Sequence, residues 1–269
     1  MSQPKVDLQL DRAHSARMYD YFLGGRTNFQ ADREAVATIL GVMPEILIAA
    51  RENRKFVHRS TRFLAQQGLR QFLDIGTGIP THPNLHEVAQ AVAPDARIVY
   101  VDNDPIVLAH AEALLQSTPE GRTAYIHADL ADPESILGSP ELHEALDLSQ
   151  PVALSLNAVL HFIVDDDLAA GSVARLKEAL APGSSLTITH GSSDLVPQRT
   201  VEGTQVYRNA GTAVRTRSRE QVAAFFAGWE PVEPGLTTIY RWRPDPDDAG
   251  GLTDQQAGMY AAVARKPSE

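Results

Sequence analysis

Three aspartates stand at or just after the ends of apolar stretches that are typical of short buried strands: Asp74, Asp102 and Asp129. Asn103 and Leu130 directly follow two of them. A carboxylate accepts hydrogen bonds from hydroxyl and amine groups, so this pattern suits a ligand that carries both. Each aspartate could equally cap a helix or stabilise a turn. Three acids at three successive strand ends favour the ligand interpretation.

A glycine-rich turn, Gly76-Thr77-Gly78, follows the first of these strands. A strand that runs into Gly-x-Gly is how an open α/β sheet makes room for a nucleotide-like ligand. A dinucleotide site also needs a third glycine and an immediate helix, whose N–H groups hold the pyrophosphate. Here Pro80 and Pro83 remove N–H donors and delay the helix. The turn therefore suits a ligand with a ribose and an amino-acid end but no phosphate.

His161 is the best candidate for acid–base work or for orienting a substrate, because it comes just after a fourth apolar strand, residues 152–156. It could equally pack beside Phe162, with its ring satisfied by a backbone carbonyl. Tyr19 and Tyr21 offer hydroxyls on an aromatic-rich segment ahead of the first strand, and Tyr21 is the catalytic candidate of the two. The alternative is that Tyr19 packs in the core of the protein. The nine histidines are scattered without metal-ligand spacing, so we predict no metal site.

Composition narrows the class of protein. The 269 residues allow one large domain or two small ones, and the absence of cysteine excludes disulfides and thiolate chemistry. A net charge of −10 argues against general nucleic-acid binding, which needs a basic surface. No apolar run approaches the ~20 residues that cross a bilayer, and the N-terminal residues lack a secretory signature. We therefore expect a cytoplasmic protein that binds neither nucleic acid nor membrane.

The hydrophobic pattern changes near residue 70. Before it we expect three helices, at residues 15–23, 32–40 and 44–67. After it, strands and helices alternate, which predicts an α/β protein with a doubly wound, mostly parallel sheet. In such a sheet the carboxyl ends of the strands meet at the edge where ligands bind. We divide the chain into an N-terminal helical cap, residues 1–69, and a core, residues 70–269.

Later elements follow the same pattern. We expect a helix at residues 134–146, and two final strands at residues 229–233 and 259–265.

Two clusters of basic residues stand out. The first lies on the helix at residues 44–67, and we expect it to be a solvated face that pairs with acidic residues elsewhere. The second comprises Arg208, Arg215, Arg217 and Arg219. It suggests a segment that approaches an anionic or polar small molecule.

Several of these motifs resemble those of the class I S-adenosylmethionine-dependent methyltransferases. Residues 74–78 resemble their first motif, Asp102 their ribose-binding acid, and Asp129-Leu130 their adenine-side pair. Residues 157–162 resemble the motif that follows their fourth strand. A closer resemblance is to a largely actinobacterial family of S-adenosyl methyltransferases, formerly a domain of unknown function. It rests on residues 16–29, 74–81, 158–162 and 217–235.

The resemblance implies a Rossmann-like sheet of seven strands with the last antiparallel, a helical cap, and S-adenosyl-L-methionine as cofactor. The acceptor would be a small molecule, and His161 and Tyr21 the candidate catalytic residues. Two other functions remain open. The first is a protein that senses the cofactor without turnover. The second is an NAD(P)-dependent oxidoreductase, which is disfavoured because Pro80 and Pro83 remove N–H groups that would bind its pyrophosphate. The residues expected to bind the cofactor are Gly24, Gly25, Asp74, Gly76, Thr77, Gly78, Pro80, Asp102, Asn103, Asp129, Leu130, Asn157 and Ala158.

Overall fold

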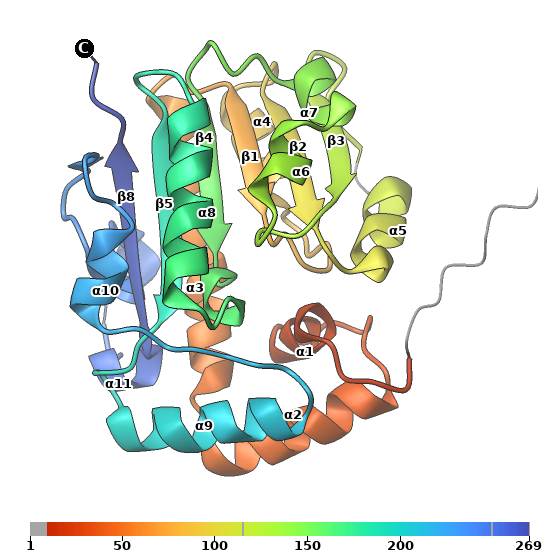
Figure 1. The fold of residues 1–269 in the computed structure, drawn as a ribbon, viewed down its shortest axis with the longest axis vertical. Coiled ribbons are helices and arrows are strands. Elements are labelled where there is room, and N and C mark those ends of the chain that lie inside the picture. The colour runs from red at the N-terminus through yellow and green to blue at the C-terminus, as the bar shows by residue number, and fades with distance from the viewer. Residues whose placement is uncertain (1–9, 115, 249, 269) are drawn as a thin grey trace, which may run out of the picture.

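A central sheet organises the protein, seen in a computed structural model that describes residues 10–114, 116–248 and 250–268 (Figure 1). The strand order is β3-β2-β1-β4-β5-β8-β6, and β7 also pairs with β8. Strands β1 to β5 run parallel, whereas β8 is antiparallel to its neighbours. The strands are β1 Gln71–Ile75, β2 Arg97–Asp102, β3 Arg122–His127, β4 Ala153–Asn157, β5 Ser185–Gly191, β6 Glu230–Pro231, β7 Thr237–Thr238 and β8 Met259–Arg265.

This topology confirms the predicted mostly parallel α/β fold with an antiparallel last strand. The sheet has eight strands rather than the seven expected, because the two residues of β7 add a short pair to β8. Strand β1 lies at the centre, with Leu73 in register with Val99 of β2 and Leu154 of β4. All five residues of β1 are buried, as a strand covered on both faces requires.

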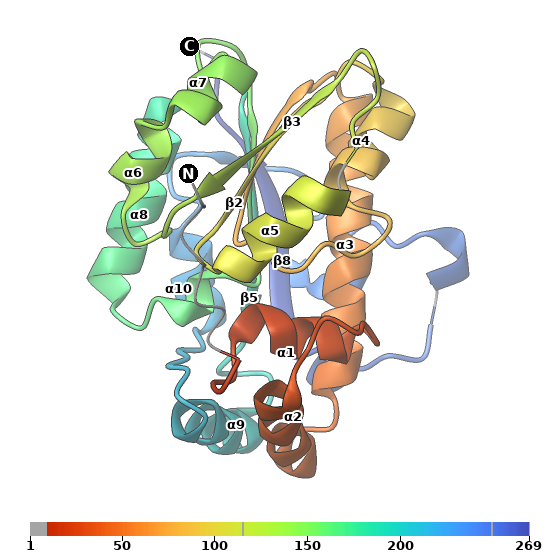
Figure 2. The same ribbon diagram turned by 90° about the vertical axis from the view of Figure 1, so that its right-hand side faces the viewer.

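Helices cover both faces of the sheet: α3 and α4 lie on one, and α6, α7, α8 and α10 on the other (Figure 2). The helices are α1 Ser15–Phe22, α2 Gln30–Val42, α3 Ile46–Gln66, α4 Leu85–Val92, α5 Pro105–Leu114, α6 Pro133–Leu137, α7 Pro140–Ala145, α8 Asp166–Ala179, α9 Pro197–Asn209, α10 Arg219–Ala224 and α11 Asp254–Ala257. Short 3₁₀ turns occupy Leu160–Phe162, Ile239–Arg241 and Pro246–Asp248.

Three local features differ from the prediction. The strand expected at residues 229–233 is reduced to Glu230–Pro231, the two residues of β6. The helix expected at residues 134–146 is split into α6 and α7, because Pro140 holds Ser139 in an extended conformation and lacks an N–H to continue the ladder. Helix α9 was not expected at all. Among the described helices, none is long and apolar enough to span a membrane.

Helix α3 packs against the central sheet. Its residues Phe56 and Leu64 share an apolar cluster with Phe72 and Ile98 of the central strands. Helices α1, α2 and α9 form a second, small cluster with the first turns of α3, which includes Met18, Val36, Ile39 and Ala50. The division of the chain at residue 69 stays a prediction, and residues 1–9 lie outside the described part. In packing terms, the cap consists of α1, α2 and α9.

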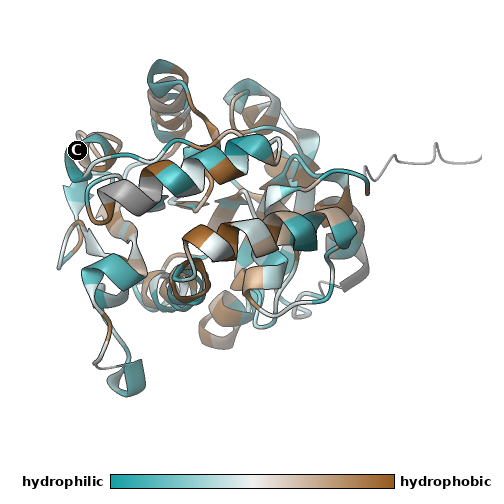
Figure 3. Ribbon diagram, turned by 90° about the horizontal axis from the view of Figure 1, so that it is seen from below, coloured by the Kyte–Doolittle hydropathy of each residue, from teal (hydrophilic) through white to brown (hydrophobic). Residues whose placement is uncertain are grey.

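Helices α2 and α9 lie side by side below the sheet, although about 150 residues separate them in the sequence (Figure 3). The carboxyl ends of β1, β2 and β4 point toward these cap helices (Figure 1). The space between the strand ends and the cap is where a ligand site is expected.

Candidate functional site

A cavity of about 750 Å³ lies between the carboxyl ends of the parallel strands and the cap. Strands β1 and β4 are neighbours at its centre, and the chain order reverses there, since β2 and β3 lie on one side and β5 on the other. This reversal is the point at which open α/β sheets bind ligands. Pockets that hold a drug-sized ligand range from about 300 to 1,000 Å³, so the cavity is large enough for a nucleoside and a small second molecule.

The glycine-rich turn forms one wall of the cavity, and both of its glycines have positive φ angles. Gly76 has a φ of 76°, and a Cβ added there would lie 2.4 Å from a methyl group of Val159. Any side chain at this position would therefore push the turn away from the end of β4. Gly78 has a φ of 68° and donates its N–H to an Asp102 carboxylate oxygen at 2.8 Å.

Asp102 ends β2 and lines the cavity beside this turn. Its carboxylate accepts from the N–H groups of Gly78 at 2.8 Å and Asp104 at 2.9 Å. Burial is the main cause of a raised pKa, and these two hydrogen bonds oppose it. Two oxygens offer about four acceptor positions, so the half-buried group keeps capacity for ligand hydroxyls.

Asp74 lies deeper, with 9 % of its surface exposed, and also lines the cavity. Burial raises the pKa of its carboxyl group to about 7, against the opposing effects of the Arg54 charge and a Thr77 hydrogen bond. Arg54 itself donates to the carbonyl oxygens of Thr81 and Pro83. The site thus holds a carboxyl group that a bound cation would favour in its ionised form.

Asn103, Asp129 and Leu130 line the far side of the cavity, beyond Asp102. Asn103 Nδ2 donates to one Asp129 oxygen at 3.0 Å, and the Ala131 N–H donates to the other at 2.8 Å. Asp129 is exposed, whereas Leu130 is buried. An exposed acceptor beside an apolar side chain suits a flat heterocycle with an amino group.

Asn157 and Ala158 follow β4 and also line the cavity. Asn157 Oδ1 is buried and has no hydrogen-bond partner among the described residues. Ala158 has a φ of 52°, which is uncommon for a residue with a side chain, and its N–H donates to Thr189 Oγ1 at 2.8 Å. An unmatched acceptor and a strained backbone beside a cavity are features of ligand sites.

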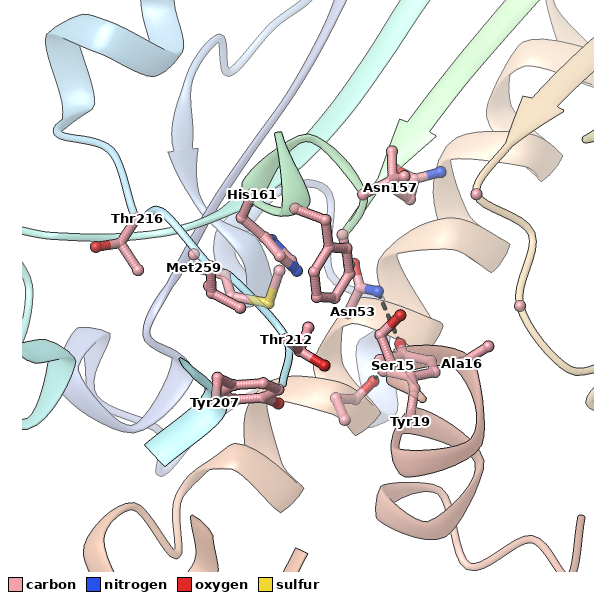
Figure 4. Close-up of a pocket in the computed structure, with 18 of the residues that line it drawn as sticks. Ser15, Ala16, Tyr19, Asn53, Asn157, His161, Tyr207, Thr212, Thr216 and Met259 are labelled. Carbon is pink, nitrogen blue, oxygen red and sulfur yellow. Dashed lines mark hydrogen bonds between the residues drawn. The ribbon is translucent and has the colours of Figure 1, made fainter. Parts of the chain in front are cut away.

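His161 lies on the 3₁₀ turn after β4, and its imidazole points into the cavity (Figure 4). Its Nδ1 is buried and has no hydrogen-bond partner within the described chain. Burial, with His190 and Arg217 nearby, lowers the pKa of the imidazole to about 3. His161 is therefore neutral at physiological pH, and its imidazole is a weak base that does not take up a second proton. The backbone-carbonyl partner considered for its ring is not found in the described structure.

Arg217 fixes the turn that carries His161. The arginine is buried, and its guanidinium donates to the carbonyl oxygens of Leu160 at 3.0 Å and Ile163 at 2.9 Å. It also donates to His190 Nε2 at 3.0 Å and contacts Asp166 at 3.0 Å. A planar group with five donors is suited to holding several acceptors at once.

A polar chain that the sequence did not reveal crosses the cavity wall (Figure 4). Asn53 of α3 is buried, and its Nδ2 donates to the Tyr19 hydroxyl at 2.7 Å. Its Oδ1 accepts from Thr189 Oγ1 at 2.7 Å. Because Thr189 also receives the Ala158 N–H, this chain links α1, α3, β5 and the loop after β4. Asn53 lacks any local signal, since its partners are 34 and 136 residues away.

Four predicted residues lie outside the cavity lining: Tyr21, Gly24, Gly25 and Pro80. Tyr21 is 37 % exposed. It lies two residues, or about 200° around the helix, from Tyr19, so the two side chains face opposite ways. A Cβ on Gly25 would lie 2.0 Å from an Asp20 oxygen, so that glycine serves the turn after α1.

Most basic side chains of the two clusters already form hydrogen bonds or ion pairs with other residues of the protein. Arg215 forms two hydrogen bonds with Asp166, at 2.8 and 2.6 Å, and Arg208 donates to Gln205. On α3, Lys55 and Arg62 pair with acidic residues of the segment 245–248, as expected. Arg59 differs from that expectation because it is buried.

The predicted absence of a metal site is not contradicted in the described part of the chain, where no group of three ligand side chains is assembled.

Comparisons with known proteins assign the chain to a family. The family model described as S-adenosyl methyltransferase matches residues 1–267, and the chain therefore belongs to that family. The structure of a DUF574 family protein from Streptomyces avermitilis is 48 % identical, with a TM-score of 0.94 over 97 % of this chain and all of that one. A protein from Thermobifida fusca, described as a putative methyltransferase, is 39 % identical, with a TM-score of 0.89 over the full length of both. No curated protein matches.

The family and the sheet topology confirm the class I methyltransferase fold and the resemblance found in the sequence.

Proposed function

We propose that this protein binds S-adenosylmethionine in the cavity and transfers its methyl group to a small molecule. The observation that carries the proposal is the set of groups at the switch point between β1 and β4. One cavity combines a glycine turn with few N–H groups to bind a phosphate, the Asp102 carboxylate, and Asn157 Oδ1, which has no hydrogen-bond partner among the described residues. Membership of the S-adenosyl methyltransferase family supports the same conclusion.

The residues fit the chemical groups of this cofactor. Asp102 would hold the ribose hydroxyls, and Asp129 with Leu130 would take the adenine ring and its amine. The cofactor carries an ammonium and a sulfonium, and the buried Asp74 and Asn157 Oδ1 are acceptors that suit positive charge. Pro80 and Pro83 leave few N–H groups for a pyrophosphate, which weakens the case for a dinucleotide.

Methyl transfer demands alignment more than acid–base chemistry. The bound cofactor would supply an electrophilic methyl group, and displacement needs an in-line nucleophile and a dry site. The cap helices α1 and α9 cover the strand ends and would exclude water. His161, neutral and pointing into the cavity, would orient the acceptor by a hydrogen bond.

Isothermal titration with S-adenosylmethionine, S-adenosylhomocysteine and NAD(H) tests the proposal. We expect the first two to bind, and Asp102→Ala to weaken binding by about 1–3 kcal/mol. Asp95→Ala is a matched control, since that aspartate is exposed, lies outside the cavity lining and forms a surface ion pair with Arg70. Preference for NAD(H), or unchanged affinity in Asp102→Ala, would contradict the assignment. Binding without formation of S-adenosylhomocysteine from any acceptor pool would indicate a sensor.

A further inference from the structure

One end of the cavity is not needed by the groups assigned to the cofactor. We call it the acceptor end, and it comprises Met43, His161, Phe162, Tyr207, Thr212 and Met259. In Figure 4, His161, Tyr207, Thr212 and Met259 lie on one side of the view, and Asn157 and Ala16 lie on the other. Gly203 brings α9 close to this end, since a Cβ there would lie 3.0 Å from Met43 Cε.

Charged side chains near the acceptor end already have partners. Arg215 and Arg217 both bind Asp166, and Glu45 is not free either. His161, the titratable group that points into this end, is held neutral by its surroundings. A ligand charge placed here would lose its hydration without gaining a counter-charge, which costs several kcal/mol.

The polar capacity of the acceptor end consists of uncharged groups. The hydroxyls of Tyr207 and Thr212 have no hydrogen-bond partner among the described residues. Burial raises the pKa of Tyr207, so its hydroxyl stays neutral. The thioether of Met259 and the ring of Phe162 supply apolar contact beside them. Hydroxyls on an apolar wall orient a ligand by hydrogen bonds without requiring charge.

We propose that the acceptor end takes an uncharged, mostly apolar ring compound with one hydroxyl or carbonyl group, recognised by Tyr207, Thr212 and the neutral His161. This inference rests on the proposed function and names the substrate class for it. It departs from the anionic acceptor that the arginines near residue 215 suggest in the sequence, because those arginines are held by Asp166.

Three probes with one ring system test the charge preference: 2-naphthol, 2-naphthoate and 2-naphthylmethylammonium. Each is titrated at neutral pH into the full-length protein saturated with S-adenosylhomocysteine. We expect 2-naphthol to bind roughly tenfold or more tightly than either charged probe. The reverse order, with 2-naphthoate tightest, would overturn the inference in favour of an anionic acceptor.

Variants test the site. Tyr207→Phe and Thr212→Val each remove one hydroxyl and keep the side-chain shape. Each is therefore expected to lower the affinity for 2-naphthol by about threefold to tenfold. Arg208→Gln is the matched control, because this exposed α9 side chain lies outside the cavity lining. Equal affinity in all three variants would overturn the inference.

Binding of S-adenosylhomocysteine is measured first in each variant. If the unaltered protein did not bind S-adenosylhomocysteine, the proposed function would be refuted. Binding of S-adenosylhomocysteine together with no binding of 2-naphthol would refute only the acceptor class.

Discussion

Asp74 is the residue whose chemistry is most altered by its position. Its carboxyl pKa of about 7 lies far above the ordinary value of about 3.9, because the group is buried with one weak hydrogen bond from Thr77. The folded protein therefore holds this proton more tightly than the unfolded chain. Stability from this group is fully present below about pH 4 and is lost as the pH rises toward 7.

Asp74→Asn should remove this pH dependence. The variant is expected to match the unaltered protein at about pH 4 and to exceed its melting temperature by a few degrees at about pH 8. Thermal unfolding without ligand, followed across this range, provides the measurement. Asp95→Ala is the control, and a difference that stays constant with pH would show that Asp74 is ionised throughout.

The same residue should couple cofactor binding to protons. A bound cation lowers the Asp74 pKa, so binding of S-adenosylmethionine is expected to release a proton and to tighten as the pH rises from about 5.5 to 7. Titration calorimetry in buffers of different ionisation enthalpy measures that release. The release should largely disappear in Asp74→Asn, and its persistence there would assign the proton to another group.

At the scale of elements, the turn that carries His161 depends on one buried guanidinium. Arg217→Lys keeps the charge but cannot reach the carbonyl oxygens of Leu160 and Ile163, His190 and Asp166 together. We expect a loss of about 2–4 kcal/mol in the free energy of unfolding, measured by urea titration.

Arg215→Lys is the matched control for that experiment, because the exposed Arg215 contacts the same Asp166. Its cost should stay below about 1 kcal/mol. Equal costs for the two variants would mean that Arg217 acts through Asp166 alone.

Asn53 joins elements that are distant in the sequence. Asn53→Ala removes one hydrogen bond from each of the Tyr19 and Thr189 hydroxyls, which keep only their bonds to backbone groups, and this is expected to cost about 1–3 kcal/mol. Hydrogen exchange should become faster in α1 and in the loop after β4. Asn209→Ala, at the exposed end of α9, should change neither. Unchanged exchange in Asn53→Ala would show that α1 is held by apolar packing alone.

The predictable parts of the fold and site are those with a local cause. Strand ends were found because an apolar run followed by an acid or amide is visible within a few residues, as at Asp74 and Asp102. Helix α9 is not predictable from the sequence, because its residues are largely polar and it is held in place by packing against α2, which is distant in the chain. The cavity is lined by Tyr19 rather than by the predicted Tyr21, because nothing local in the sequence tells which face of α1 meets α3.

At the scale of the whole molecule, the cap contacts the core around the cavity, through α3, and through an apolar cluster that joins Ala16 to Ile79 and Ile106. Cofactor bound between them should slow hydrogen exchange in both α1 and α9, although the two helices lie far apart in the sequence. Exchange measured with and without S-adenosylhomocysteine checks this, with α7 as an internal control remote from the cavity. Protection of α1 without α9 would mean that the two helices do not close on the ligand together.

The pairing of α2 with α9 also bears on how the protein is made. Translation adds about 5–20 residues per second, so roughly 10–30 s pass between the synthesis of α2 and that of α9. During that interval, the apolar face of α2 that contains Val36 and Ile39 has no α9 to cover it. A nascent chain stalled after β5 should therefore expose this face, and chaperones that bind apolar helices should associate with it until α9 emerges.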